Sequence, residues 1–300
     1  AVQSSEWCRK GNIQSGADYL RCWMASLIHD TAQPLPYLFL AGPQNSGKSI
    51  FHECAGFLFD GGITSANNSL TSSFNGELEG CFLVYVEERD LADKRHNSYE
   101  KIKEWVTGRT LSIRPLYQQQ FTTTNYLHFV QMANNTTHLP MEDGDTRIVA
   151  CDVPALTDPI PKQVMEKHLA EEAPRFLRTL LNTVVPPPCD RLRIPALKTA
   201  TKELMERRAM SPVMSFTKEK LIDCPGHKVQ FEKFYAEFET YCAANGIKAP
   251  QAFTVYQEVM LRSDRFTLGN RNDKHFLLNA TFDPKAKPKK RIVPNSSGRF

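Results

Sequence analysis

Short apolar runs separated by polar loops predict an α/β fold for the first half of the chain. The runs at 37–40 (YLFL), 82–86 (FLVYV) and 126–132 (YLHFVQM) are rich in aliphatic and aromatic residues. Runs of this length are typical of inner strands in a sheet that is covered on both faces. Apolar residues at helical spacing predict helices at 16–29, 50–59 and 99–106.

The second half of the chain is mainly helical in its pattern. The triplet Pro186–Pro188 reads as a stiff linker between two of the helices. Two later helices precede two short strands that flank Gly269-Asn270, and this order predicts a winged helix. The helices are expected at 161–181, 197–210, 229–247 and 252–261, and the strands at 265–268 and 275–278.

These patterns predict an α/β core with a central parallel sheet, followed by a helical segment and a winged-helix-like domain. The expected parts are a helical lead-in (1–35), the core (36–155), the helical segment (156–225), the winged-helix-like domain (226–283) and a basic tail (284–300).

Composition narrows the class of protein. The chain has 300 residues, 41% of them hydrophobic, and a net charge of +4, which allows a nucleic-acid partner without requiring one. No apolar stretch reaches about eighteen residues and no signal peptide is apparent, so we expect a soluble, intracellular protein that does not contact a membrane. The chain opens with Ala1, which suggests a piece of a longer polypeptide.

The cysteines predict neither a zinc site nor a disulfide framework. Eight are present, none of them in a CxxC pair, and we interpret them as reduced and mostly buried. Cys224 and His227 form half of a possible metal site, but no second pair lies at a suitable distance. We expect these two residues to lie in a loop.

The strongest chemical signal is a match to GxxxxGK[ST] between a predicted strand and a predicted helix. Backbone N–H groups of such a loop surround a β-phosphate, the lysine reaches the β- and γ-phosphates, and the hydroxyl binds Mg²⁺. The pattern therefore predicts ATP and Mg²⁺ as ligands. The eight residues are Gly42, Pro43, Gln44, Asn45, Ser46, Gly47, Lys48 and Ser49.

Two carboxylates follow the second apolar run. Glu87 and Glu88 stand at the carboxyl end of that strand, where ligands bind in open α/β sheets. One carboxylate can hold Mg²⁺ through water while the other polarises the attacking water. We assign Glu87, together with Ser49, to Mg²⁺ and Glu88 to the water. A surface acidic pair without a role is the alternative.

Across residues 20–155, about half of the chain, the order of motifs resembles the superfamily 3 helicases, which have an AAA+-like P-loop core. The matching segments are 42–49, the strand that ends in Glu87-Glu88, the segment 103–113 (KEWVTGRTLSI) and the strand 129–134 (FVQMAN). Such helicases occur in parvoviruses, papillomaviruses and phage or plasmid primase-helicases.

This resemblance implies roles for two further residues. Asn134 would sense the γ-phosphate or orient water, and the adjacent Asn135 competes for that role. Arg147, in the stretch 143–147, would be an arginine finger that acts on a neighbouring subunit's nucleotide. An ordinary surface arginine paired with Asp145 is the alternative.

Nucleic-acid contacts are less well defined. The helicases usually carry a lysine in the hairpin after motif B, and the segment 117–122 has none. Arg114 can contact phosphate, and Tyr117 or Phe121 can stack on bases; a hairpin that only packs is the alternative. The basic tail either grips nucleic acid or is a flexible, solvated end. Arg262, Arg265, Arg271 and Lys274 add positive charge near the predicted hairpin.

The resemblance implies a ring, a hexamer by analogy, that couples ATP hydrolysis to movement on single-stranded DNA. Its context would be a phage or viral replication protein in the host cytoplasm, with a primase or polymerase part in the same parent chain. Two alternatives stay open: a P-loop kinase, although 160–180 has only Arg175 and Arg178 for a lid, and a platform that binds DNA depending on nucleotide without unwinding it.

Overall fold

The computed structural model describes residues 1–92, 97–142, 144–188, 190–262 and 266–300. Asp143, Cys189 and Arg265, which the sequence predictions included, lie outside these ranges, as does the side chain of Arg262. The chain divides into unit 1, Ala1–Ala209, and unit 2, Met210–Phe300. No helix within the described ranges is long and apolar enough to span a membrane.

Five parallel strands form the central sheet of unit 1, in the order β2-β3-β6-β1-β7. This arrangement confirms the mixed α/β class and the central parallel sheet. The strands are β1 (Tyr37–Ala41), β2 (Ile63–Ser65), β3 (Leu83–Glu87), β6 (His128–Ala133) and β7 (Ile148–Asp152). Because all five run in the same direction, their carboxyl ends meet at one edge of the sheet.

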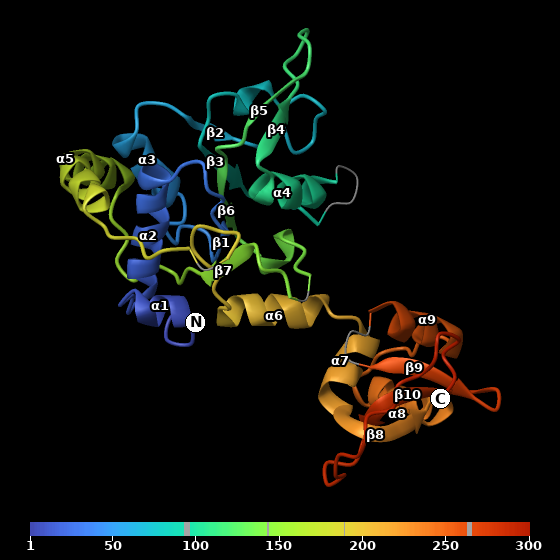
Figure 1. Ribbon diagram of the computed structural model, residues 1–300. Helices are drawn as coiled ribbons and strands as arrows, with labels where there is room; N and C mark the ends of the chain where they lie inside the picture. The colour runs from blue at the N-terminus through green and yellow to red at the C-terminus, as the bar shows by residue number, and fades with distance from the viewer. Residues whose placement is uncertain (93–96, 143, 189, 263–265) are drawn as a thin grey trace. The chain divides into compact units, whose positions relative to one another are not determined.

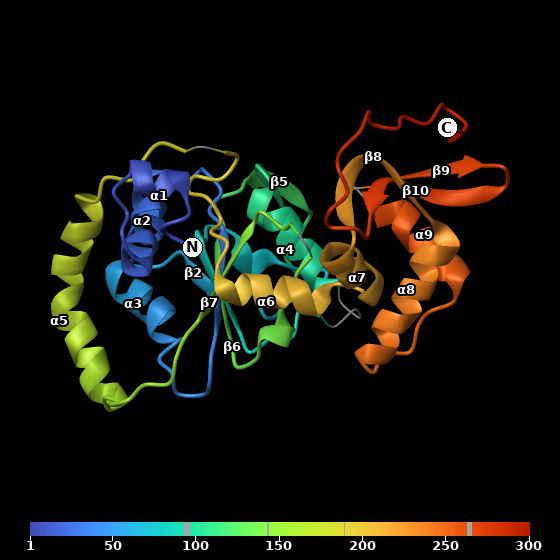
Figure 2. The ribbon, with the colours of Figure 1, turned by 90° about the horizontal axis from the view of Figure 1, so that it is seen from below.

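Helices cover both faces of this sheet, as Figures 1 and 2 show. Side chains alternate along β1, so Leu38 and Leu40 pack on one side and Tyr37 and Phe39 on the other. The first side is covered by α1 (Glu6–Lys10), α2 (Gly16–His29), α3 (Ile50–Leu58) and α5 (Lys162–Leu181). The second is covered by α4 (Ser98–Thr107) and α6 (Ala200–Ala209).

An antiparallel hairpin extends from the second side. Strands β4 (Thr110–Ile113) and β5 (Phe121–Thr124) pair from Thr110–Thr124 to Ile113–Phe121. The buried side chains of Leu111 and Ile113 anchor β4 in the core. The loop between the strands projects beyond the rest of unit 1 in Figure 1. Residues Phe121–Thr124 therefore form a strand of their own that pairs with β4 and precedes the central strand β6.

Unit 2 combines helices with a three-stranded antiparallel sheet in the order β8-β10-β9. Its core is aromatic, with Phe216, Phe234 and Phe238 almost fully buried. The elements are α7 (Pro212–Lys220), β8 (Ile222–Gln230), α8 (Phe231–Ala244), α9 (Ala252–Arg262), β9 (Thr267–Arg271) and β10 (Lys274–Thr281). Residues 284–300, here called the strap, follow β10.

The expectation of a loop around Cys224 and His227 is wrong, because both residues lie on β8. Pro225 and Gly226 between them conceal the strand in the sequence, since this pair usually marks a turn. Pro225 is tolerated because β8 is an edge strand of the sheet, next to β10. Gly226 has a φ of +79°, and the register of β10 shifts beside it between Leu278 and Ala280.

Candidate functional site

The loop Gly42–Ser49 connects the end of β1 to the start of α3. Two glycines are required by geometry: a Cβ on Gly42 would lie 2.1 Å from the carbonyl oxygen of Val153, and Gly47 has a φ of +81°. Asn45 also has a positive φ of 60°. The loop therefore folds tightly on itself at the N-terminus of a helix, a position that favours anions.

Lys48 reaches across this loop. Its Nζ donates to the carbonyl oxygens of Gly42 at 2.9 Å and Pro43 at 2.7 Å, and to the side chains of Ser46 at 3.3 Å and Asn134 at 3.1 Å. Burial lowers the pKa of the Lys48 ammonium, and the nearby Glu88 carboxylate opposes this shift.

Residues from two neighbouring strands meet this lysine. Asn134 follows β6, and its Nδ2 donates to Oε1 of Glu88, which follows β3, at 2.7 Å. Glu88 has a φ of 48° and its N–H donates to the carbonyl oxygen of Met132 at 2.9 Å, so its backbone is fixed against β6. Lys48, Asn134 and Glu88 thus form one hydrogen-bonded chain across three strand ends.

Asn135, the alternative to Asn134, caps a short helix and does not line the cavity. Its side chain accepts the N–H of Thr137 at 3.0 Å and caps the short 3₁₀-helix Thr136–His138. Only Asn134 of the two lines the cavity beside the loop. The structure therefore brings Asn134, and not Asn135, to Lys48 and Glu88.

A cavity of about 890 Å³ opens beside the loop. One wall is polar and contains the loop, Glu87, Glu88 and Asn134, whereas the other is mainly apolar and comes from residues after β7. The apolar wall includes Ala155, Leu156, Pro159, Ile160 and Met165. The cavity therefore extends past residue 155, where the sequence placed the end of the core.

Sequence reasoning missed the polar side chains that α3 and α5 bring to this site. Glu53 lines the cavity, and its Oε1 accepts from Nζ of Lys162 on α5 at 3.1 Å. His52 stacks on Tyr85 with ring centroids 4.3 Å apart, and its Nε2 lies 3.7 Å from Oε1 of Glu87. Glu53, in the first turn of α3, lies four residues after the N-cap residue Ser49, a spacing that could have identified it.

The oxygen atoms at the cavity suit Mg²⁺. This ion keeps several waters and binds proteins through few oxygen ligands together with substrate phosphates. Ser49 supplies a hydroxyl and Glu87 an exposed carboxylate to the same cavity. Within the described ranges no group of three or more His, Cys, Asp or Glu side chains could hold a metal by itself.

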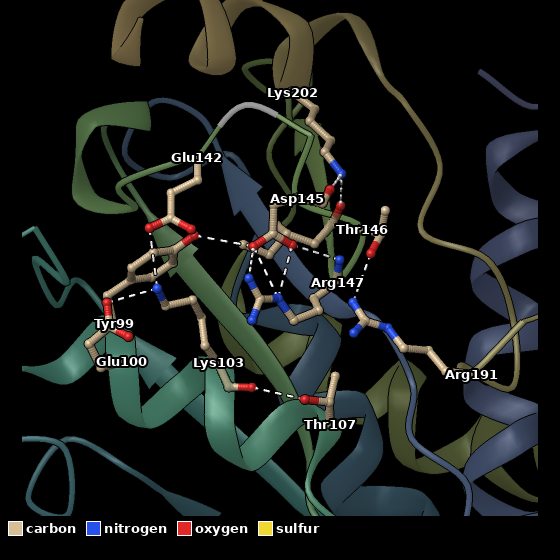
Figure 3. Close-up of polar contacts among 11 residues, drawn as sticks. Tyr99, Glu100, Lys103, Thr107, Glu142, Asp145, Thr146, Arg147, Arg191 and Lys202 are labelled. Atoms are coloured by element: carbon tan, nitrogen blue, oxygen red, sulfur yellow. Dashed lines mark hydrogen bonds and ion pairs between the residues drawn. The ribbon is translucent and has the colours of Figure 1, made fainter. Parts of the chain in front are cut away.

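Arg147 does not line this cavity. Its guanidinium forms an ion pair with Asp145, with Nη2 2.6 Å from Oδ2 and Nε 3.2 Å from Oδ1 (Figure 3). The Asp145 side chain is fully buried and that of Arg147 is 22% exposed. Burial would raise the pKa of Asp145, but the hydrogen bonds from Arg147 outweigh burial and lower it.

A second cation holds the same segment. Nζ of Lys202, on α6, donates to the carbonyl oxygens of Asp145 and Ile148, the latter at 2.9 Å. Arg191 donates to the Thr146 hydroxyl at 2.7 Å (Figure 3). The residues before β7 are therefore fixed from two sides, and Arg147 is held at the surface of unit 1.

The hairpin residues predicted to contact nucleic acid lie apart from the cavity lining. Tyr117, in the loop, is 95% exposed, and Phe121 is 38% exposed. Arg114 lies over the ring of Phe74 at 5.1 Å, and its backbone is tied to Asn75 by two hydrogen bonds. The rings of Tyr117 and Phe121 are thus exposed, and the contacts of Arg114 stabilise the base of the hairpin.

Comparisons with known proteins identify a matching family model, a phage relative and solved structures of similar fold. Residues 40–147, from the end of β1 to Arg147, match a model described as a family of unknown function, DUF5906. The chain is 27% identical over 139 residues to the DNA primase-polymerase of Nitratiruptor phage NrS-1. That alignment covers 43% of this chain and 19% of the relative.

Solved structures extend the similarity of fold to most of the chain. The apo C-terminal region of NrS-1 matches with a TM-score of 0.66 at 15% identity, covering 88% of this chain and 70% of that one. A second apo form matches with a TM-score of 0.64 at 14% identity, covering 90% and 72%. The chain is therefore a homologue of a phage primase-polymerase and shares the fold of its C-terminal region.

Proposed function

We propose that this chain is the ATP-hydrolysing motor domain of a phage or viral replication protein and acts as a helicase or translocase on single-stranded DNA. The observation that carries the proposal is the hydrogen-bonded chain Lys48–Asn134–Glu88, which unites three separate sequence signals in one cavity. A cation, a neutral amide and a carboxylate in this order supply what phosphate binding and water activation require.

In this proposal, the position of each residue in the cavity determines its role in ATP hydrolysis. Lys48 leaves the loop carbonyls to bind the β- and γ-phosphates, and the loop N–H groups surround the β-phosphate. Glu88 polarises the attacking water while Asn134, held by Glu88, orients it toward the γ-phosphate. Ser49 and Glu87 would hold Mg²⁺, which neutralises charge on the phosphates when bound.

The apolar wall gives the nucleotide base a place. When the phosphates are bound at the loop, the part of the cavity beside Leu156 and Ile160 remains open for the flat face of a base.

In this proposal the first unit is a P-loop core of the AAA+ type, similar to the superfamily 3 helicases. The second is a winged-helix-like domain, supported by its order α7-β8-α8-α9-β9-β10.

The assembly and context follow from the same proposal. Arg147 lies outside the cavity of its own subunit, which suits a finger that reaches a neighbour's nucleotide in a ring, with six subunits by analogy. Single-stranded DNA would meet Tyr117 and Phe121 in the exposed hairpin. A primase or polymerase part would belong to the same parent chain, in the host cytoplasm.

The fate of the γ-phosphate separates this proposal from a kinase. We expect it to be released as inorganic phosphate, because the Glu88–Asn134 pair faces a cavity that water can enter. Transfer of radiolabelled γ-phosphate to a nucleoside or to a DNA end would contradict the proposal. Tight ATP binding with no release, even with DNA present in an assembled ring, would instead favour a binding platform.

The trans role of Arg147 is tested by mixing two inactive variants. Arg147→Lys keeps a cation for the buried Asp145 but removes the two-pronged guanidinium, so we expect nucleotide binding without turnover. Lys48→Ala has a damaged cavity but an intact Arg147. A randomly mixed ring would recover up to about a quarter of wild-type turnover, because one interface in four joins an intact cavity to an intact finger.

The controls for this mixture are its assembly and each variant's thermal midpoint. If the two variants assemble together and the mixture still shows no turnover, Arg147 does not act across the interface. Recovery would also exclude the interpretation of Arg147 as a surface residue whose only role is to pair with Asp145.

A further inference from the structure

The positive charge of the chain is concentrated in unit 2. Residues 210–300 contain fifteen Lys and Arg against nine Asp and Glu, whereas the rest of the chain has a slight acidic excess. Within unit 2 the strap holds six of these cations and no acidic residue. Its cations are Lys285, Lys287, Lys289, Lys290, Arg291 and Arg299. The charge is therefore segregated to one short segment.

The helices of unit 2 have the opposite character. In the winged-helix order α9 would be the helix expected to meet DNA, yet it has one acidic residue, Glu258, and one basic residue, Arg262, at its end. Its exposed side chains include Phe253, Met260 and Leu261, which suit phosphates poorly. Helix α8 carries three glutamates and one lysine. The helical face is thus not the electrostatic partner of a polyanion.

The strap is fixed to the sheet and is not a loose tail. The N–H of Lys289 donates to the carbonyl oxygen of Pro225 at 2.8 Å, and Nε2 of His227 lies 3.0 Å from the carbonyl oxygen of Lys287. Buried Asn279 accepts the N–H of Ile292 at 2.8 Å and donates back to its carbonyl oxygen at 2.9 Å.

The far end of the strap is held at β9 and β10. The N–H of Asn270 donates to the carbonyl oxygen of Gly298 at 2.8 Å, and Phe300 packs edge-on against Phe276 at 5.5 Å. Nζ of Lys228, on β8, lies 5.0 Å and 4.9 Å from the centroids of these two rings. The strap therefore lies against the outer face of the sheet, where exposed Lys228 of β8 is a seventh cation beside the six of the strap.

The cationic side chains are left available by this packing. Lys285, Lys287, Lys289, Lys290 and Arg291 are all exposed, and no hydrogen bond or ion pair of their side chains is found within the described ranges. The acidic side chain nearest in sequence, Asp283, accepts the backbone N–H of Lys285 at 2.9 Å. A fixed backbone presents these charges without the entropy cost of ordering a flexible tail.

We infer that the strap and the outer face of the β8-β10-β9 sheet form a binding surface for the phosphate backbone of DNA, and that α9 does not. We expect charge contacts, because the strap presents exposed cations and Lys228 lies over the rings of Phe276 and Phe300. Binding should therefore be independent of base sequence and strongly dependent on salt.

The test compares two triple substitutions that remove the same charge from the full chain. Lys285→Gln, Lys287→Gln and Lys290→Gln change the strap, while Lys220→Gln, Lys233→Gln and Lys248→Gln change exposed lysines on or near the helices. Affinity for fluorescein-labelled oligo-dT is measured by anisotropy, without nucleotide, over a range of salt concentrations. Thermal midpoints establish that both variants are folded.

We expect the strap variant to bind at least about tenfold more weakly, with a salt slope lower by about 2, since each lost phosphate contact removes about 0.7. The helix variant should stay within about twofold of wild type. Equal losses in both variants would show a general charge effect and overturn the inference, as would an unchanged strap variant.

Binding of the protein to vesicles that contain anionic lipids is measured as a comparison with oligo-dT. Binding to vesicles that depends on the strap, without such binding to oligo-dT, would also overturn the inference. Failure of ATP hydrolysis has no bearing on this result, because every measurement is made without nucleotide.

Discussion

Glu88→Gln is expected to slow ATP hydrolysis by about a hundredfold or more while nucleotide binding stays close to wild type. Glutamine has the same shape and can still accept the hydrogen bond that Asn134 donates to Glu88 at 2.7 Å. What it loses is the negative charge that polarises water. Steady-state phosphate release and equilibrium binding of a labelled nucleotide measure the two effects separately.

Glu53→Gln is the matched control for this prediction. It makes the same chemical change in the same cavity, but Glu53 pairs with Lys162 whereas Asn134 donates to Glu88. We expect hydrolysis within about threefold of wild type, the size of a lost exposed ion pair. Similar losses in both variants would mean that the site needs negative charge in general and that Glu88 has no special role.

Lys48→Ala is expected to weaken ATP binding by about tenfold to a hundredfold, and to lower turnover further. A hydrogen bond to a charged group contributes about 1.5–3 kcal/mol, and the lysine is the only cation that the structure places on the loop side of the cavity within the described ranges. The substitution also removes the ammonium that bridges the carbonyl oxygens of Gly42 and Pro43. Calorimetric titration with a slowly hydrolysed ATP analogue measures the loss.

Lys162→Ala separates the role of Lys48 from that of positive charge alone. Lys162 also lines the cavity, but its side chain is 71% exposed and pairs with Glu53. We expect less than about a threefold change in affinity. If Lys162→Ala weakened binding as much as Lys48→Ala, the phosphates would lie nearer to α5 than to the loop.

Local signals made much of the site predictable. The loop Gly42–Ser49 was predictable because all of its functional residues are consecutive. Glu87 and Glu88 were predictable because they follow directly on a buried apolar strand. Parallel strands then bring their carboxyl ends together without further information from the sequence. Three strands and the helices between them were predictable because their apolar patterns are also local.

Other features depend on contacts between distant residues. Glu53 and Lys162 are 109 residues apart, and the apolar wall of the cavity lies beyond the predicted end of the core. The choice between Asn134 and Asn135 rests on which side chain turns toward Lys48, and adjacent residues give no sequence signal for that. In unit 2 the pair Pro225-Gly226 concealed β8, and the strap is ordered by Asn279, which no pattern singles out.

We propose that the cavity beside Lys48 hydrolyses ATP in a motor that responds to DNA. The test is steady-state phosphate release from ATP in Mg²⁺ buffer, with and without single-stranded DNA, on protein whose mass in solution is recorded in the same buffer. We expect an oligomer whose turnover rises when DNA is added and falls in Glu88→Gln. An oligomer that binds both ATP and DNA but releases no phosphate would contradict it.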